Sequence, residues 1–351
     1  MATANGSLCN ISGSVSENGS CIGCMESDIE QGTVKAIQAW IAYLLIPINL
    51  ISIFANLFVI VAVTRTSHLQ EPAPKLIANL AVADFIICVR IVFIAPMTFL
   101  IEFPPKIICF GYCAVVTLLA LASTNSLIAI NVDKYIAILR PLHYYQIVTP
   151  RVILLMVVLA WSFAVFLSVS SLIGNRWQPD QLCIYDIVSS KRAVISGSVF
   201  TVMCVIAIAF IYAYMMMIAK HHQRQIHQKP SNSGSQEAGA TGKSFSAELA
   251  KHLKLAKTFG IVVGAFGVCW TPHFILMLLS VPDVYHDTLG VATGFGYMMA
   301  DTNSFMNFFI YASKNSQFRA AFRAVLPSRG HSRRVYCPTL LELSRLFHPF
   351  D

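Results

Sequence analysis

The sequence predicts an all-α membrane protein, a seven-transmembrane helix bundle followed by a short amphipathic eighth helix. Three observations lead to this prediction. Hydrophobic residues make up 56 % of the 351 residues and charged residues only 12 %, whereas about a quarter of an ordinary soluble domain is charged. Seven segments are long, apolar and almost free of charge, and Lys and Arg gather on alternate connections between them. A chain this poor in charge cannot cover a water-soluble fold of its size.

Each of the seven segments is long enough to span a membrane, because a helix needs about 20 apolar residues to cross the hydrocarbon core. Five segments contain no Asp, Glu, Lys or Arg; the second contains Asp84 and Arg90, and the seventh contains Asp301. None alternates apolar and polar residues as a strand of a membrane barrel does. The segments lie between the charged residues at positions 35 and 65, 75 and 102, 106 and 133, 151 and 176, 192 and 220, 257 and 283, and 287 and 314.

The distribution of basic residues predicts the orientation. With seven spans, five Lys and Arg residues fall on the side of the N-terminus, nineteen fall on the other side, and Arg90 lies within the membrane. Because basic connections stay in the cytosol, we expect a plasma-membrane protein with its N-terminus outside and its C-terminus in the cytosol. The net charge of +8 is therefore a topology signal and gives no support for nucleic-acid binding.

The segments outside the spans have distinct compositions. Residues 1–35 are predicted to form an extracellular tail glycosylated at the sequons of Asn5, Asn10 and Asn18. The bundle is expected over residues 36–313, with a flexible cytoplasmic linker at about 221–250 that is rich in Ser, Gly, Ala and Gln. Residues 314–326 are predicted to form an amphipathic helix along the inner leaflet. Residues 327–351 form a cytoplasmic tail in which Cys337 is a candidate palmitoylation site.

Motifs inside the segments carry a family resemblance. In chain order they are Asn56, Leu80-Ala81-Val82-Ala83-Asp84, Asp133-Lys134-Tyr135, Trp161, Cys269-Trp270-Thr271-Pro272 and Asn307-Phe308-Phe309-Ile310-Tyr311. Over about residues 36–326 the chain resembles a rhodopsin-like (class A) G-protein-coupled receptor, with loose similarity to melanocortin, adenosine and amine receptors. It departs from the family pattern where Lys134 replaces an arginine, where Phe308 replaces a proline, and where the fifth segment lacks a proline.

The resemblance implies a cell-surface receptor that converts binding of an extracellular small molecule or short peptide into activation of a heterotrimeric G protein. Arrestin and membrane lipid are further expected partners. The resemblance also implies a disulfide between Cys109 and Cys183. It implies an activation and G-protein face made of Asp133, Lys134, Tyr135, Leu142, Tyr212, Phe266, Pro272 and Tyr311.

A polar core is predicted in the cytosolic half of the bundle. At 1.5 Å per residue from the cytosolic helix ends, Asp84, Ser123 and Asn303 lie at a similar depth, and Asn307 lies one turn lower. Oxygen ligands of this kind suit a sodium ion, and the resemblance implies the same set. The alternative is a hydrogen-bonded cluster that only ties the helices together. No other cofactor is predicted, and retinal is excluded because Asp301 stands where opsins hold the retinal lysine.

The predicted ligand pocket contains Arg90, Val116, Trp270 and Asp301. Arg90 and Asp301 fall at a similar depth in the outer half of the membrane, where an unpaired charge costs about 2.5–3.5 kcal/mol on insertion scales. We therefore expect the two either to form a structural salt bridge or to contact the ligand. Val116 stands where amine receptors carry an aspartate, which disfavours an ordinary biogenic amine unless Asp301 takes the cation.

Other functional classes were weighed against the receptor. The sequence contains no catalytic triad, phosphate-binding glycine loop or HExxH metal motif, so no enzyme is predicted. A seven-helix ion or solute transporter is an alternative, with Asp84, Arg90 and Asp301 as a relay. A second alternative is a decoy receptor that binds ligand without G-protein coupling, because Lys134 and Phe308 replace family residues.

Overall fold

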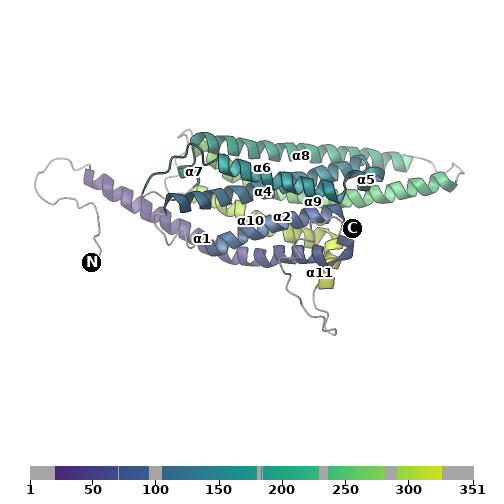
Figure 1. Cartoon of the computed structure of the whole chain (residues 1–351), viewed down its shortest axis with the longest axis horizontal. Helices are drawn as coiled ribbons and strands as arrows, with labels where there is room; N and C mark the ends of the chain where they lie inside the picture. The colour runs from purple at the N-terminus through teal and green to yellow at the C-terminus, as the bar shows by residue number, and fades with distance from the viewer. Residues whose placement is uncertain are drawn as a thin grey trace, which may run out of the picture.

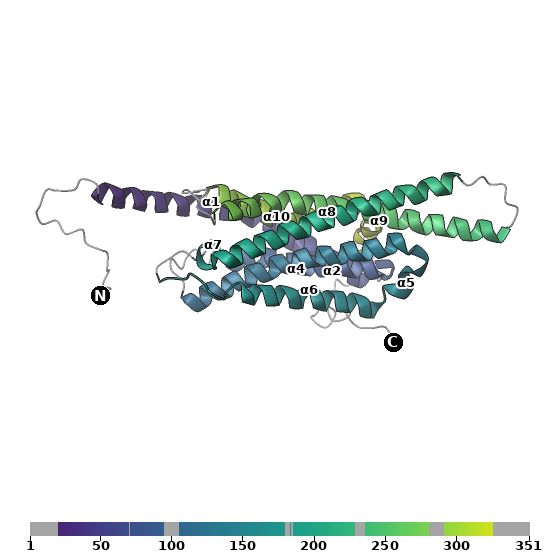
Figure 2. The same cartoon turned by 90° about the horizontal axis from the view of Figure 1, so that it is seen from above.

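The computed structural model describes residues 20–69, 71–94, 105–179, 183, 185–228, 236–280 and 291–325, and within them all regular structure is helical. Seven long helices run roughly along one direction and form a single bundle (Figures 1 and 2). The seven-transmembrane helix bundle expected from the sequence is thereby confirmed. The long helices are α1 (Ser20–Arg65), α2 (Pro72–Val89), α4 (Lys106–Leu139), α6 (Pro150–Ser170), α8 (Lys191–Gln228), α9 (Gln236–Ser280) and α10 (Val291–Lys314).

Short helical segments connect or extend the long ones. A π-helical turn, η2, continues α2 in the outer half of the bundle, and three short helices follow α4 or precede α8. The last helix, α11, comes directly after α10. The short segments are η1 (Ser67–Leu69), η2 (Arg90–Ile94), η3 (Pro141–His143), α5 (Tyr144–Ile147), α7 (Tyr185–Val188) and α11 (Ser316–Val325).

Membrane-spanning length and apolarity distinguish six of the described helices from the seventh. Stretches of α1, α2 with η2, α4, α6, α8 and α9 are long and apolar enough to cross a membrane. Helix α10 has 24 residues but is less apolar, because it carries Asp301, Asn303 and Asn307. It packs against α1, α2 and α9, and Asn303 and Asn307 are buried on the side that these helices cover.

Helix α4 is the centre of the bundle, since it contacts α2, α6, α8 and α9. Polar side chains join these helices across the apolar core. Asn79 on α2 donates to Ser126 Oγ on α4 at 2.8 Å and accepts from Trp161 Nε1 on α6 at 3.0 Å. Asn56 on α1 donates to the carbonyl of Ser304 on α10 at 3.2 Å. Such bonds stabilise helix association in lipid, where the hydrophobic effect does not drive helices together.

Three predicted boundaries differ from those observed. Helix α1 begins at Ser20 within the predicted tail, α8 continues to Gln228, and α9 begins at Gln236 within the predicted linker. Extending an existing helix adds one hydrogen bond for each residue ordered, and the Gln, Glu, Ala and Lys residues here favour helix. The beginning of α1 and the extensions of α8 and α9 protrude from opposite ends of the bundle (Figures 1 and 2).

Several predicted modification sites and segments lie outside the described residues. These are the glycosylation sites Asn5, Asn10 and Asn18, the candidate palmitoylation site Cys337, and residues 327–351 of the predicted tail.

Helix α11 corresponds to the amphipathic helix expected at residues 314–326, but its apolar face packs on the bundle. The ring centroid of Phe318 lies 5.4 Å from that of Tyr311, and the Phe322 centroid lies 5.0 Å from Phe58 and 5.2 Å from Phe308. Phe318 and Phe322 are buried as a result. Phe308 therefore joins an aromatic cluster that fixes α11 against α1 and α10.

Candidate functional site

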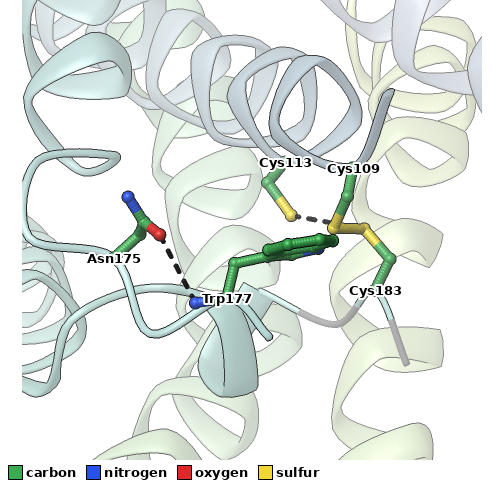
Figure 3. Close-up of a disulfide and its surroundings, with 5 residues drawn as sticks. All are labelled: Cys109, Cys113, Asn175, Trp177 and Cys183. Carbon is green, nitrogen blue, oxygen red and sulfur yellow. Dashed lines mark hydrogen bonds between the residues drawn. A yellow bond between two sulfur atoms is a disulfide. The ribbon is translucent and has the colours of Figure 1, made fainter. Parts of the chain in front are cut away.

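The predicted extracellular end of the bundle carries the predicted disulfide, which the structure confirms. Cys109 in the first turn of α4 is bonded to Cys183, with 5.6 Å between their Cα atoms. Cys113, one turn further along α4, places its sulfur 4.0 Å from the Cys183 sulfur. Figure 3 shows the three cysteines together, with the Trp177 ring reaching toward the disulfide. No sequence signal singled out Cys113, so this arrangement was not predicted.

Arg90 lies below the disulfide, at the point where α2 changes into the π-helical turn η2. Such turns are often found at functional sites because they redirect side chains. The Arg90 Nη1 donates to the Tyr112 hydroxyl on α4 at 2.8 Å, and Nη2 lies 3.9 Å from Asp301 Oδ1 on α10. The expected pair of Arg90 and Asp301 thus comes together, with Tyr112 as a third member. No sequence signal distinguished Tyr112 from the other tyrosines.

The two charges of this pair are held very differently. The Arg90 side chain is 9 % exposed and is fixed by the Tyr112 hydroxyl, whereas 20 % of the Asp301 side chain is exposed. Within the described part of the chain, no donor comes within hydrogen-bond distance of the Asp301 carboxylate, and Arg90 is its one ionic partner. Asp301 therefore retains acceptor capacity for a further donor.

Asp84 forms the centre of the polar core. Its side chain is fully buried. Oδ1 accepts from Ser123 at 3.2 Å and from Ser304 at 3.0 Å, and Oδ2 accepts from Asn307 at 2.6 Å. The structure thus gathers three of the four predicted residues and adds Ser304, which sequence reasoning missed although it lies one turn from Asn307 on the same helix.

Two amide oxygens indicate that this polar core fits a cation. The fourth predicted residue, Asn303, is buried but does not bond to Asp84. Among the described residues, neither Asn303 Oδ1 nor Asn307 Oδ1 has a hydrogen-bond partner. Because Asn307 donates to Asp84 through its nitrogen, its oxygen lies close to the carboxylate. The donor set is all oxygen, as hard cations require.

Aromatic side chains lie on either side of Pro272 in the C-terminal third of α9. Trp270 lies 5.9 Å from Phe266 and 5.4 Å from Phe274, measured between ring centroids. His273 contacts Tyr297 on α10 at 4.3 Å and is buried; sequence reasoning did not select it. These rings form one packed column, and among the described residues Trp270 Nε1 has no hydrogen-bond partner. Val116 is half-buried on α4, one turn from Tyr112.

At the predicted cytosolic end, Asp133 is held from two sides. Lys134 Nζ lies 2.6 Å from Asp133 Oδ2, and the Tyr144 hydroxyl donates to Oδ1 at 2.6 Å. Lys134 is buried, and its ammonium lies 5.3 Å from the ring centroid of Phe259 on α9. Burial and the neighbouring Asp133 raise the pKa of Tyr144, so its hydroxyl remains a donor. We call Asp133, Lys134 and Tyr144 the cytosolic latch.

The other predicted residues of the G-protein face surround this latch. Tyr311 packs between Phe259 and Phe318. Tyr135 and Tyr212 pack around the small apolar cluster of Ile138 and Met215. Leu142 in η3 is 58 % exposed.

Comparisons with known proteins agree on one family. The family model of the 7 transmembrane receptor (rhodopsin family) matches residues 55–311. Three relatives are alpha-1A adrenergic receptors. The one from Oryzias latipes is 29 % identical over 85 % of this chain and 68 % of its own length. Those from Oryctolagus cuniculus and Homo sapiens are 31 % and 28 % identical, each over 79 % of this chain and 65 % of the relative.

The geometry of Arg90 and Asp301 generates a double-mutant prediction. Arg90→Gln or Asp301→Asn alone leaves one charge without its partner inside the membrane, so surface expression should fall several-fold. The double variant should recover most of the loss, because the two residues are coupled. Flow cytometry of a tagged receptor measures this, with Tyr112→Phe as the control that keeps both charges. Losses that simply add in the double variant would show that the two side chains do not interact.

Proposed function

The chain belongs to the rhodopsin family of seven-transmembrane receptors, and from this premise we propose that Arg90 and Asp301 bind its ligand. Members of this family are multi-pass membrane proteins and G-protein-coupled receptors, not enzymes, so a ligand and a heterotrimeric G protein are its general partners. The family match favours the receptor over a transporter. The aligned relatives, named adrenergic receptors, support a small-molecule ligand, although the chain spans only about two thirds of their length.

We propose that the ligand is a small zwitterion with an ammonium and a carboxylate a few bonds apart, as in an α-amino acid. Asp301 has acceptor capacity for the ammonium, and the Arg90 guanidinium suits a carboxylate because it offers donors in a planar fork. The Arg90–Asp301 pair is neutral as a whole. An amine or an acid alone would add a net charge to a buried site, whereas a zwitterion adds none. A short peptide fits less well, since its two termini lie far apart.

This proposal predicts a specific change of ligand preference. Cells expressing the receptor with a promiscuous G protein should respond to α-amino acids, and not to the corresponding decarboxylated amines or N-acetylated acids. Arg90→Gln should shift the preference toward the amines and Asp301→Asn toward the N-acetylated acids. Each variant should lose about 10- to 100-fold in potency for the zwitterion, the size expected for one hydrogen bond to a charged group.

The responses are compared at matched surface expression, so that poor expression of a variant does not resemble lost binding. Tyr112→Phe keeps both charges and should retain the preference for zwitterions. Equal potency of an amino acid and its decarboxylated amine on the unmodified receptor would refute the zwitterion proposal. The proposal would also be refuted if the receptor gives a measurable basal signal and no amino acid changes that signal.

We further propose that sodium binds at Asp84 and stabilises the inactive state. Asp84, Ser123, Ser304 and Asn307 would hold the ion, and the unpartnered Asn307 oxygen supports this assignment. The ion would supply positive charge to a fully buried carboxylate.

The sodium proposal predicts that Asp84→Asn abolishes the effect of sodium on ligand affinity or on basal signalling, because it removes the one full negative charge of the core. Titration of sodium against an inert large cation in isolated membranes measures this effect. Thr124→Val is the matched control, since the Thr124 hydroxyl bonds to the carbonyl of Ala120 in its own helix. A sodium response that persists in Asp84→Asn would exclude Asp84 as a ligand.

We propose that the cytosolic latch keeps the G-protein face closed in the absence of ligand. The supporting observation is that Lys134 is buried between Asp133 and the Phe259 ring of α9. Separation of α9 from α4 would expose this side chain to a G protein. The aromatic column around Pro272 is the part of α9 best suited to bend, because proline removes one backbone hydrogen bond.

The latch predicts the effect of removing one hydroxyl. Tyr144→Phe removes the bond to Asp133, worth about 0.5–1.5 kcal/mol, and should raise ligand-independent signalling about two- to ten-fold. The adjacent Tyr145→Phe is the control. Second-messenger output at matched surface expression is the measurement. If the unmodified protein is silent and neither Tyr144→Phe nor Lys134→Arg produces a signal, the result would instead support a decoy receptor that binds ligand without G-protein coupling.

We place the receptor in the plasma membrane with its N-terminus outside and its C-terminus in the cytosol. The disulfide supports this orientation, because disulfides persist in oxidising compartments and it lies at the beginning of α4. The basic residues gather toward the opposite side, as cytosolic connections do. The same cytosolic face would serve arrestin as an alternative partner to the G protein, and membrane lipid surrounds the exposed apolar residues.

A further inference from the structure

Three sulfur atoms meet at the outer end of α4, although only two of them form the disulfide. The sulfurs of Cys109, Cys113 and Cys183 all lie within 4.8 Å of one another, and that of Cys113 is 4.0 Å from that of Cys183. Cys109 and Cys113 come from successive turns of the same helix, whereas Cys183 comes from the connection before α7 (Figure 3). Cys183 is therefore within reach of two alternative partners on one rigid element.

The side chains around the three cysteines favour thiol–disulfide exchange among these cysteines over exchange with external thiols. Cys109 and Cys113 are each 1 % exposed. The apolar side chains of Leu172, Trp177, Tyr185 and Val188 pack around them. Diffusible thiols and oxidants are thus kept out, while the sulfurs that can exchange are already in proximity.

We propose that Cys183 exchanges its disulfide partner between Cys109 and Cys113. The Cys113 thiol gives up its proton, and the resulting thiolate attacks the Cys183 sulfur. The Cys113–Cys183 bond forms while the Cys109–Cys183 bond breaks, and Cys109 leaves as a thiolate that takes up a proton. One disulfide and one thiol are present before and after the step, so no oxidant or reductant is required.

The exchange changes where the connection before α7 is attached to α4. Four residues of an α-helix span about 6 Å along its axis, so the second attachment point is about 6 Å deeper in the bundle. Cys113 also follows Tyr112, the residue that holds Arg90. The deeper attachment therefore lies next to the residue that positions the Arg90 guanidinium. The exchange itself stands on the sulfur geometry and does not depend on the ligand class.

Removal of Cys109 tests the exchange directly. In Cys109→Ala, Cys183 should form a disulfide with Cys113, which mass spectrometry detects as a linked peptide after denaturation and alkylation in acid, where exchange is slow. Cys109→Ala/Cys113→Ala should leave Cys183 fully alkylated. The control Cys109→Ala/Cys204→Ala removes a cysteine of α8 and should keep the Cys113–Cys183 link. Fully alkylated Cys183 in Cys109→Ala at the cell surface would overturn the proposal.

The unmodified receptor gives an independent test if Cys109→Ala does not fold. Membranes are denatured and alkylated in acid, where exchange is slow, so that the partner that Cys183 holds at that moment is preserved. Part of the receptor should then yield peptides with alkylated Cys109 and a Cys113–Cys183 link. The Cys109–Cys183 link in all of the receptor, with no alkylated Cys109, would also overturn the proposal. Cys113→Ser should abolish the Cys113–Cys183 peptides without removing the original disulfide.

Discussion

A charge inside a bilayer must find its counter-charge or its hydrogen bonds within the protein, and this constraint organises the bundle. Three carboxylates illustrate it at successive levels. Asp301 faces Arg90 toward the end that carries the disulfide, Asp84 accepts three hydrogen bonds in the middle, and Asp133 is bound by Lys134 and Tyr144 toward the opposite end. At each level at least one partner comes from another element, so satisfying the charge also fixes how the elements pack.

Helix α10 connects these levels. Asp301, Ser304, Asn307 and Tyr311 are spaced by three or four residues and therefore lie along one face of the helix. This face meets Arg90, the buried Asp84 and the Phe259 ring in turn. A small rotation or axial shift of α10 alters the contacts at all three levels together, because a helix moves as a rigid element.

Two of the three departures from the family pattern, Lys134 and Phe308, are accommodated by local packing. The compact ammonium of Lys134 fits a buried position between Asp133 and the Phe259 ring, where the cation is stabilised by a carboxylate and by a π face. Phe308, in place of a proline, fills the space between Phe58 and Phe322 and so binds α11 to the bundle. Both replacements thus have structural partners that keep the local packing intact.

The sequence by itself determined the number of spans and the positions of the membrane charges, because the apolar environment limits where charge can occur. It also indicated the pairs Cys109–Cys183 and Arg90–Asp301. Only the tertiary structure decided the additional partners: Tyr112 beside Arg90, Ser304 beside Asp84, Tyr144 beside Asp133, and Cys113 beside the disulfide. It also left Asn303 without a bond to Asp84. Spacing along a helix specifies the depth of a residue, but contact between helices depends on rotation and tilt, which are set by packing over the whole interface.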